Sequence, residues 1–305
     1  MTTQIDIPTT PPSPVSFGEA FRYWLKLGFI SFGGPAGQIS MMHHDLVEKR
    51  RWISEHRFLH ALNYCMVLPG PEAIQLAIYI GWLMHGVLGG IIAGILFFLP
   101  ALVLLTSLSW IYIAFGDLPV VAGVLYGIKP AVTAIVVFAA YRIGSKALKN
   151  GVLWALAAAA FVAIAPFGLD LPFPAIVLAA AILGVIGGRL APDMFKAGGG
   201  HGASNKTHGP ALIDDHTPVP DHARFRWSRV VTFLVVGLAL GIGVFAVLLA
   251  LYGWQGTLTQ MGWFFTKAAF LTIGGAYAVL PYVYQGGVEH YGWLTGPQMM
   301  DGLAL

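Results

Sequence analysis

Five uninterrupted apolar runs occupy most of the chain between His85 and Tyr252. They cover residues 87–115, 120–141, 151–169, 172–190 and 230–252. An α-helix needs about 20 apolar residues to cross the hydrocarbon core of a bilayer, so each run is long enough to span a membrane. Charged residues make up only 10% of the sequence, against about 25% in soluble domains. The sequence therefore predicts an all-α polytopic membrane protein whose partner is the lipid bilayer.

Two regions before these runs are apolar but interrupted. Residues 17–48 contain Gly-Gly-Pro at 33–35, and residues 57–85 contain Pro-Gly-Pro at 69–71. Glycine favours non-helical backbone and proline lacks the N–H that continues a helix, so both motifs should end helices. Unpaired backbone at membrane depth is tolerated only inside protein or beside a wet cavity. We expect two helix–break–helix re-entrant hairpins. The alternative is two kinked helices that cross completely.

Basic residues gather in three places, at 49–57, at 142–149, and in and beside residues 191–229. The two turns that alternate with them, around Asp117 and Asp170, carry no Lys or Arg. Because cytoplasmic loops are enriched in basic residues, we expect all three clusters on the cytoplasmic face. The flexible N-terminal tail and the polar stretch 191–229 then lie in the cytoplasm, and this stretch is expected to be a solvated linker.

The sequence also contains a weak internal repeat with an offset of 241. Residues 17–64 align without a gap over 258–305, with identities that include Lys26/Lys267, Gly33/Gly274, Gly34/Gly275, Glu48/Glu289 and Trp52/Trp293. The second unit has His290-Tyr291-Gly292 where the first has its basic cluster at 49–51. We therefore expect the second unit to begin on the outer face, as in an inverted-repeat transporter.

This organisation predicts a tail at 1–16, a first repeat at 17–190, a linker at 191–229 and the start of a second, inverted repeat at 230–305. The counterpart of the Pro-Gly-Pro motif would fall beyond Leu305. We therefore expect the second repeat to be incomplete, because the chain is a fragment or because its second half is shortened. We expect the chain to be inactive alone, unless two copies complement each other as a homodimer.

Several motifs resemble those of the chromate ion transporter family, in its long two-domain form. They are Phe32–Gln38, Lys49–Trp52, Leu68–Ala73 and Thr272–Tyr277, followed by Pro281. The similarity covers residues 17–190 and part of 257–305, and the second half departs from the family by its apparent truncation. The resemblance implies a two-half protein of the inner membrane that exports chromate from the cytoplasm and gives chromate resistance.

A site for a tetrahedral dianion such as chromate needs hydrogen-bond donors and positive potential. Helix N-termini supply both, and one should follow each break. A lysine at membrane depth is costly and usually faces a cavity or a partner. The candidate substrate-binding residues are Gly33, Gly34, Pro35 and Gln38; Pro69, Gly70, Pro71, Glu72 and Gln75; Lys26, Lys129 and Lys267; and Gly274 and Gly275.

Each of these assignments has a structural alternative. The breaks could serve only to kink helices for packing, and Lys26 and Lys267 could anchor helices at the interface. Lys129 could extend to the membrane surface or pair with Glu72. A carboxylate such as Glu72 is unusual beside an anion unless it titrates or pairs, which makes proton coupling a second interpretation.

Other functional classes find little support in the sequence. The single cysteine, Cys65, excludes CxxC redox or zinc chemistry, and no Walker A motif is present. The net charge of +3 is too small to indicate a nucleic-acid partner. We expect no enzyme activity, no cofactor and no metal site. The remaining alternatives are transport of sulfate or another oxyanion, and a membrane scaffold that transports nothing.

Overall fold

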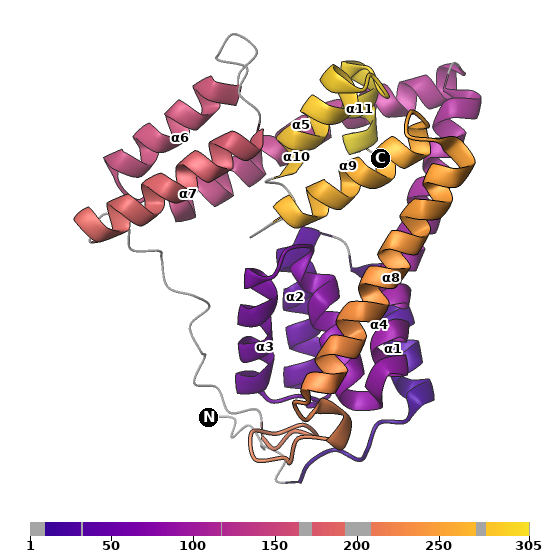
Figure 1. Cartoon of the computed structure of the whole chain (residues 1–305), viewed down its shortest axis with the longest axis vertical. Helices are drawn as coiled ribbons and strands as arrows, with labels where there is room; N and C mark the ends of the chain where they lie inside the picture. The colour runs from indigo at the N-terminus through magenta and orange to yellow at the C-terminus, as the bar shows by residue number, and fades with distance from the viewer. Residues whose placement is uncertain are drawn as a thin grey trace, which may run out of the picture. The chain divides into compact units, whose positions relative to one another are not determined.

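The computed structural model describes residues 10–31, 33–116, 118–164, 173–192, 209–272 and 279–304. Throughout these residues all regular structure is helical (Figure 1). The one extended pairing among them is an isolated bridge between Ile53 and Ile213. The predicted all-α class is confirmed.

The predicted apolar runs coincide with helices. They are α4 (Glu72–Phe115), α5 (Pro119–Ala147), α6 (Gly151–Ile164), α7 (Phe173–Leu190) and α8 (Trp227–Tyr252). Helices α4 and α8 are long and apolar enough to cross a bilayer. The last part of the run predicted to end at 169 lies outside the described residues.

Helix α4 reverses direction at His85–Gly86, where Gly86 has a φ of +64° that favours glycine. The segments on either side pack very closely. A Cβ added to Gly81 would lie 2.6 Å from the Cβ of Ala93, and one added to Gly94 would lie 2.8 Å from Ile78. These contacts run in antiparallel order, so α4 contains a tight helical hairpin held by small residues. The reversal falls between residues 85 and 87, where the sequence separates an interrupted region from an apolar run.

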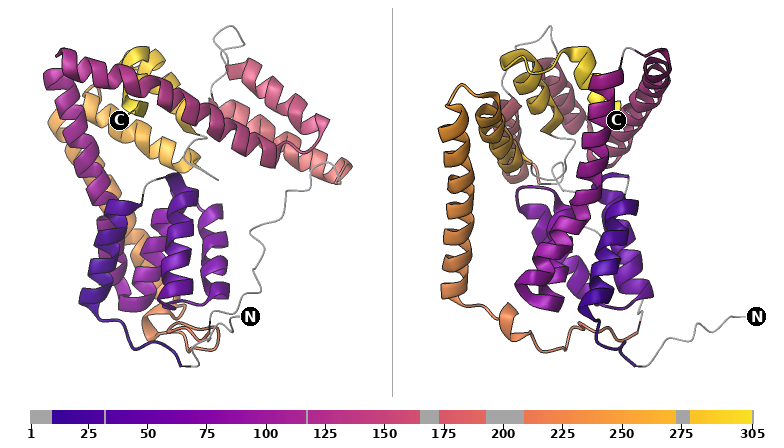
Figure 2. Two further views of the ribbon diagram at one scale, coloured as in Figure 1. Left: turned by 180° about the vertical axis from the view of Figure 1, so that it is seen from behind. Right: turned by 90° about the vertical axis from the view of Figure 1, so that its right-hand side faces the viewer.

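The chain forms two compact units, residues 1–102 with 203–278, and residues 103–202 with 279–305. In the first unit, α1 (Phe17–Ile30), α2 (Gly34–His43) and α3 (Glu55–Val67) lie beside the first part of α4 (Figure 2). A short π-helix, η1 (His44–Lys49), continues α2. The core of this unit is apolar and includes Trp24, Leu27, Met42, Leu46, Phe58, Leu62, Leu76 and Ile80.

Residues 209–226, here called the clasp, pack against the loop between η1 and α3. Ile213 donates its N–H to the carbonyl of Trp52 (3.0 Å), and Ser54 donates its N–H to the carbonyl of Ile213 (3.0 Å). Nη2 of Arg57 donates to the carbonyl of Thr217 (2.8 Å). Within the stretch expected to be a solvated linker, Ile213 is therefore buried and the backbone pairs with another loop, and the linker as a whole stays a prediction.

Both ends of the first helix–break–helix region lie together. Nη1 of Arg50, just after η1, lies 3.2 Å from Oε1 of Glu19 in the first turn of α1. The ring of His85, at the reversal in α4, lies 3.0 Å from the carbonyl of Val15. Nε2 of His222 in the clasp lies 2.9 Å from the carbonyl of Trp82. The start of α1, the loop after η1, the reversal and the clasp thus meet at one end of the first unit.

The second unit contains the end of α4 with α5, α6 and α7. It also holds α10 (Leu280–Tyr284), the π-helix η4 (Gln285–His290) and α11 (Gly296–Ala304). Helix α11 contacts α5, and α7 contacts both α6 and α10. The hydroxyl of Tyr112 in α4 donates to Oδ2 of the buried Asp301 in α11 (2.9 Å).

Local structure recurs at the offset found in the sequence. Helix α1 corresponds to α9 (Thr257–Leu271), and the two π-helices η1 and η4 start 241 residues apart. The N–H of Trp52 donates to the carbonyl of Leu46 at 2.8 Å, and the N–H of Trp293 donates to the carbonyl of Gly287 at 2.8 Å. The same turn is therefore built twice. The opposite orientation of the two units in the membrane stays a prediction.

Candidate substrate site at the helix breaks

The first break separates α1 from α2. Gly33 has a φ of +103° and precedes the first turn of α2, where Pro35 fits because a first-turn N–H has no partner within the helix. Nε2 of Gln38, one turn into α2, donates to the carbonyl of Ser31 at the end of α1 (2.9 Å). The glutamine side chain thus bridges the break and covers a carbonyl that α1 leaves unpaired.

The second break separates α3 from α4 and is built in the same way. Gly70 has a φ of +107°, and Nε2 of Gln75 donates back to the carbonyl of Pro69 (2.7 Å). The sequence suggested Gln38 and Gln75 as substrate ligands. In the structure both amide groups donate to backbone carbonyls at the breaks, and their role as substrate ligands stays a prediction.

The end of α9 meets the second break. The N–H of Gly70 donates to the carbonyl of Thr272 at 2.8 Å. Thr272 directly follows α9 and is buried, and its hydroxyl donates to the carbonyl of Ala268. The structure therefore joins the second break to the residue that ends α9, just before the segment that contains Gly274 and Gly275. Gly274 and Gly275 lie outside the described residues.

Glu72 begins α4 directly after this break and is only 6% exposed. Its Oε2 atom is buried and has no hydrogen-bond partner among the described residues, and the same holds for Oε1 of Gln75. Two acceptor oxygens, three residues apart and therefore neighbours on the helix surface, thus lack a donor.

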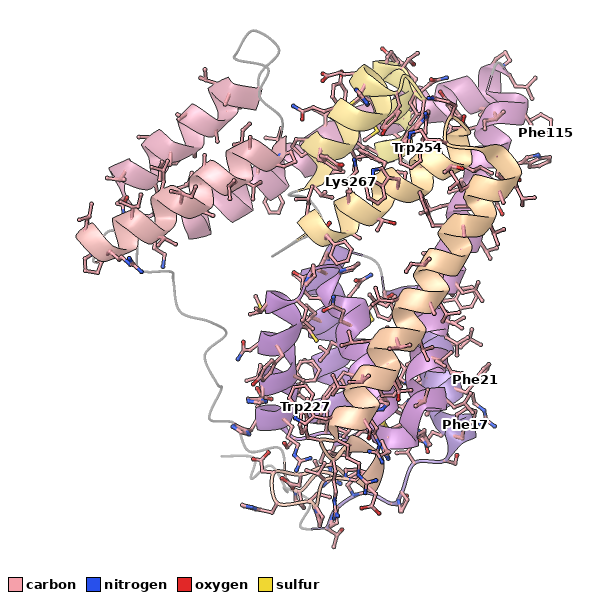
Figure 3. All side chains as sticks on the ribbon, viewed as in Figure 1. Phe17, Phe21, Phe115, Trp227, Trp254 and Lys267 are labelled. Atoms are coloured by element: carbon pink, nitrogen blue, oxygen red, sulfur yellow. The ribbon has the colours of Figure 1, made fainter. Side chains whose placement is uncertain are left out.

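The structure describes the side chains of two of the three candidate lysines. Lys26 on α1 and Lys267 on α9 occupy equivalent positions in the repeat, and both are exposed. Figure 3 shows Lys267 on α9. Its Nζ lies 5.6 Å from the centroid of the Trp263 ring. Lys129 lies within α5, directly before Pro130, but its side chain is outside the described part of the structure. Neither Lys26 nor Lys267 pairs with a residue of the breaks in the part of the chain that the structure describes.

Some polar groups in the structure were not found from the sequence. Asp301 and Tyr112 are 189 residues apart, and the only signal was a carboxylate in an otherwise uncharged segment. His43 lies between two carboxylates, 2.6 Å from Glu55 and 3.3 Å from Glu48. In the described residues no group of three or more His, Cys, Asp or Glu side chains is arranged to hold a metal ion.

Comparison with known proteins relates this sequence to a family of transporters. A family model described as chromate transporter matches residues 18–185 and 259–305, which leaves out the clasp and α8. The chain is 32% identical over 303 residues to a chromate transport protein of Pseudomonas aeruginosa, covering 96% of this chain and 63% of that protein. It is 30% identical over 290 residues to a probable chromate transport protein of Synechococcus elongatus, covering 95% of this chain and 65% of that protein.

A chromate transport protein of Cupriavidus metallidurans is 30% identical over 288 residues, covering 94% of this chain and 62% of that protein. The chain thus spans somewhat less than two thirds of the length of these relatives. No solved structure matches it. The family match covers more than half of the sequence and includes both helix breaks. The chain belongs to the chromate transporter family of membrane proteins.

Proposed function

We propose that the protein is a secondary transporter that carries chromate out of the cytoplasm across the inner membrane and thereby gives chromate resistance. The observation that carries the proposal is the pair of helix breaks within a sequence whose relatives are named chromate transport proteins. Broken helices at membrane depth are where secondary transporters bind their substrates.

The N-termini of α2 and α4 would supply the donors for the anion. Each N-terminus carries the equivalent of about half a positive charge, so two offset only about half the charge of a dianion. A lysine would supply the remaining positive charge, and Lys129, Lys26 and Lys267 stay the candidates that the sequence offers. Gly33, Gly34 and Gly70 would leave the approach to the two N-termini free of side chains, and Pro35, Pro69 and Pro71 would fix the interruptions of the helices around them.

The contacts at one end of the first unit support two re-entrant hairpins. Two complete crossings would separate the ends of each region by about 30 Å, the thickness of the hydrocarbon core. The ion pair between Arg50 and Glu19 instead brings the two ends of the first region together. In the second region, Arg57 at the start contacts Thr217 of the clasp, and Trp82 near the end contacts His222 of the clasp, so its two ends also lie together. Because this end carries Arg50, Arg51 and Arg57, we assign it to the cytoplasm together with the clasp.

Cysteine labelling tests this topology. Single cysteines at positions 51 and 86, in a protein with Cys65 replaced by serine, should react with an impermeant maleimide only from the cytoplasmic side. Labelling of either position from outside the cell would reject the hairpins. We further propose that the second repeat runs in the opposite sense, so that residues 253–256 face outward.

Transport is tested with the purified complete gene product in liposomes. Chromate should enter these vesicles faster than it enters liposomes without protein, and sulfate should compete if the site recognises the tetrahedral dianion rather than chromium. Uptake of sulfate without chromate would assign the protein to a different oxyanion. Equal chromate entry with and without protein would reject a carrier and leave the scaffold interpretation.

A further inference from the structure

In the part of the chain that the structure describes, the buried charged side chains have the opposite sign from what an anion carrier needs. Among the described residues, the buried charged side chains are Glu72 and Asp301, which are 6% and 7% exposed. Lys26 and Lys267, in contrast, are exposed. Glu72 stands at the second break, where the proposed function places the N-terminus of α4 as a donor to the anion.

Among the described residues, no cation pairs with Glu72. None of them forms an ion pair with it, and its Oε2 atom is buried without a donor. Cys65 on α3 lies within electrostatic reach of Glu72, and Tyr79 on α4 lies within reach of Cys65 and of Arg57, whose Nη2 donates to the carbonyl of Thr217 in the clasp. Neither a thiol nor a phenol carries positive charge. An ionised carboxylate left in this state is costly, and it would also repel a dianion.

The second break instead offers a set of acceptors. Gln75 has its amide nitrogen on the carbonyl of Pro69, which leaves its buried Oε1 without a donor close to Glu72 on the same helix face. The carbonyls of Pro69 and Thr272 each accept one hydrogen bond here and keep a second lone pair. Unwound backbone carbonyls beside a carboxylate are the ligands that coupling cations use in broken-helix transporters.

We propose that Glu72 and Gln75, with the carbonyls of the second break, form a binding site for a monovalent cation, either a proton or Na⁺. The cation neutralises the carboxylate of Glu72. It also gives Oε2 of Glu72 and Oε1 of Gln75 the positively charged partner that both buried oxygens lack. An anion can then approach the N-terminus of α4 without repulsion, so the two ions move in the same step. The coupling part of this inference rests on the proposed function, whereas cation binding itself does not.

Cation binding is measured first without transport. The thermal unfolding temperature of the purified complete gene product in detergent is compared in NaCl and in choline chloride at equal ionic strength. If the site holds Na⁺, this salt should raise the unfolding temperature, Glu72→Gln should abolish the increase, and Glu289→Gln, which alters an exposed carboxylate, should keep it. Equal unfolding temperatures in the two salts would exclude Na⁺ and assign the site to a proton, which the flux measurement then tests. If Glu72→Gln does not fold, Glu72→Asp serves instead and should need about tenfold more Na⁺ for the same effect.

Chromate flux into proteoliposomes then separates the two cations. A site for Na⁺ makes the flux respond to an imposed Na⁺ gradient, and a site for a proton makes it respond to an imposed pH gradient. In both cases Glu72→Gln should lose the response and Glu289→Gln should retain it. Flux that responds to neither gradient, or responds equally in Glu72→Gln, overturns the cation site and leaves chromate transport standing. Na⁺-dependent stability without any chromate flux would support the site and reject the proposed function.

Discussion

Replacing Gly70 by alanine should destabilise the protein through two separable effects. The φ of +107° at Gly70 is strained for any residue with a Cβ, at a cost of about 1–3 kcal/mol. The new Cβ would also lie 3.0 Å from Nε2 of Gln75, which must then shift by a few tenths of an ångström and so weaken its hydrogen bond to the carbonyl of Pro69. Weakening of that hydrogen bond adds up to about 1.5 kcal/mol. We expect the free energy of unfolding to fall by about 1–4 kcal/mol.

Two other glycines provide matched controls. Gly33→Ala meets the same backbone strain, with a φ of +103°, but no atom within 4 Å, so it should cost only about 1–3 kcal/mol. Gly18→Ala in the first turn of α1 meets neither backbone strain nor an atom within 4 Å, so it should raise the free energy of unfolding by up to about 1 kcal/mol. The assay is chemical unfolding in mixed micelles, followed by circular dichroism.

The comparison is sharpened by a second substitution. In a Gln75→Ala protein, the extra cost of Gly70→Ala over Gly33→Ala should disappear, since the side chain that must move is absent. If Gly70→Ala and Gly33→Ala cost the same in the unsubstituted protein, the bridge from Gln75 to Pro69 is not important. If both behave like Gly18→Ala, the geometry assigned to the two breaks is wrong.

Three further substitutions test other parts of the structure. Gly28→Ala should lower the free energy of unfolding by about 1–3 kcal/mol, because its Cβ would overlap the carbonyl oxygen of Leu96. Unchanged unfolding in micelles would contradict this close contact. Arg57→Ala should release the clasp and make residues 209–226 faster in hydrogen exchange, with the exchange of α8 unaltered; equal protection would show that Arg57 does not hold it. Lys129→Ala should abolish chromate transport at normal membrane levels, and Lys129→Arg should restore it incompletely because the planar guanidinium differs from a compact ammonium; normal transport by Lys129→Ala would remove this residue from the path.

The helices and their interruptions could be predicted because their causes are local. Gly-Gly-Pro and Pro-Gly-Pro end helices wherever they occur, and both breaks are found where the sequence places them. The reversal at His85–Gly86 follows for a similar reason, since a glycine is present where φ is positive. The repeat was visible because residues such as Trp52 and Trp293 keep their register, although the π-helices before them were not expected.

Features that depend on distant contacts could not be predicted. The clasp is polar in composition, and its packing depends on a few residues such as Ile213 that fit a loop about 160 residues earlier. The direction of the Gln75 amide was also not predictable, because a glutamine near a break is equally able to face a substrate or a backbone carbonyl. The pairing of Tyr112 with Asp301 joins two helices that no sequence pattern connects.

Uptake of radiolabelled chromate into everted membrane vesicles tests the outward transport of chromate most directly. In these vesicles the cytoplasmic face is turned outward, so export in the cell becomes uptake in the assay. Vesicles with the complete gene product should accumulate chromate above those without it, and unlabelled sulfate should reduce this uptake if the anions share one site. Accumulation in right-side-out vesicles only, or none in either orientation, would contradict a chromate exporter.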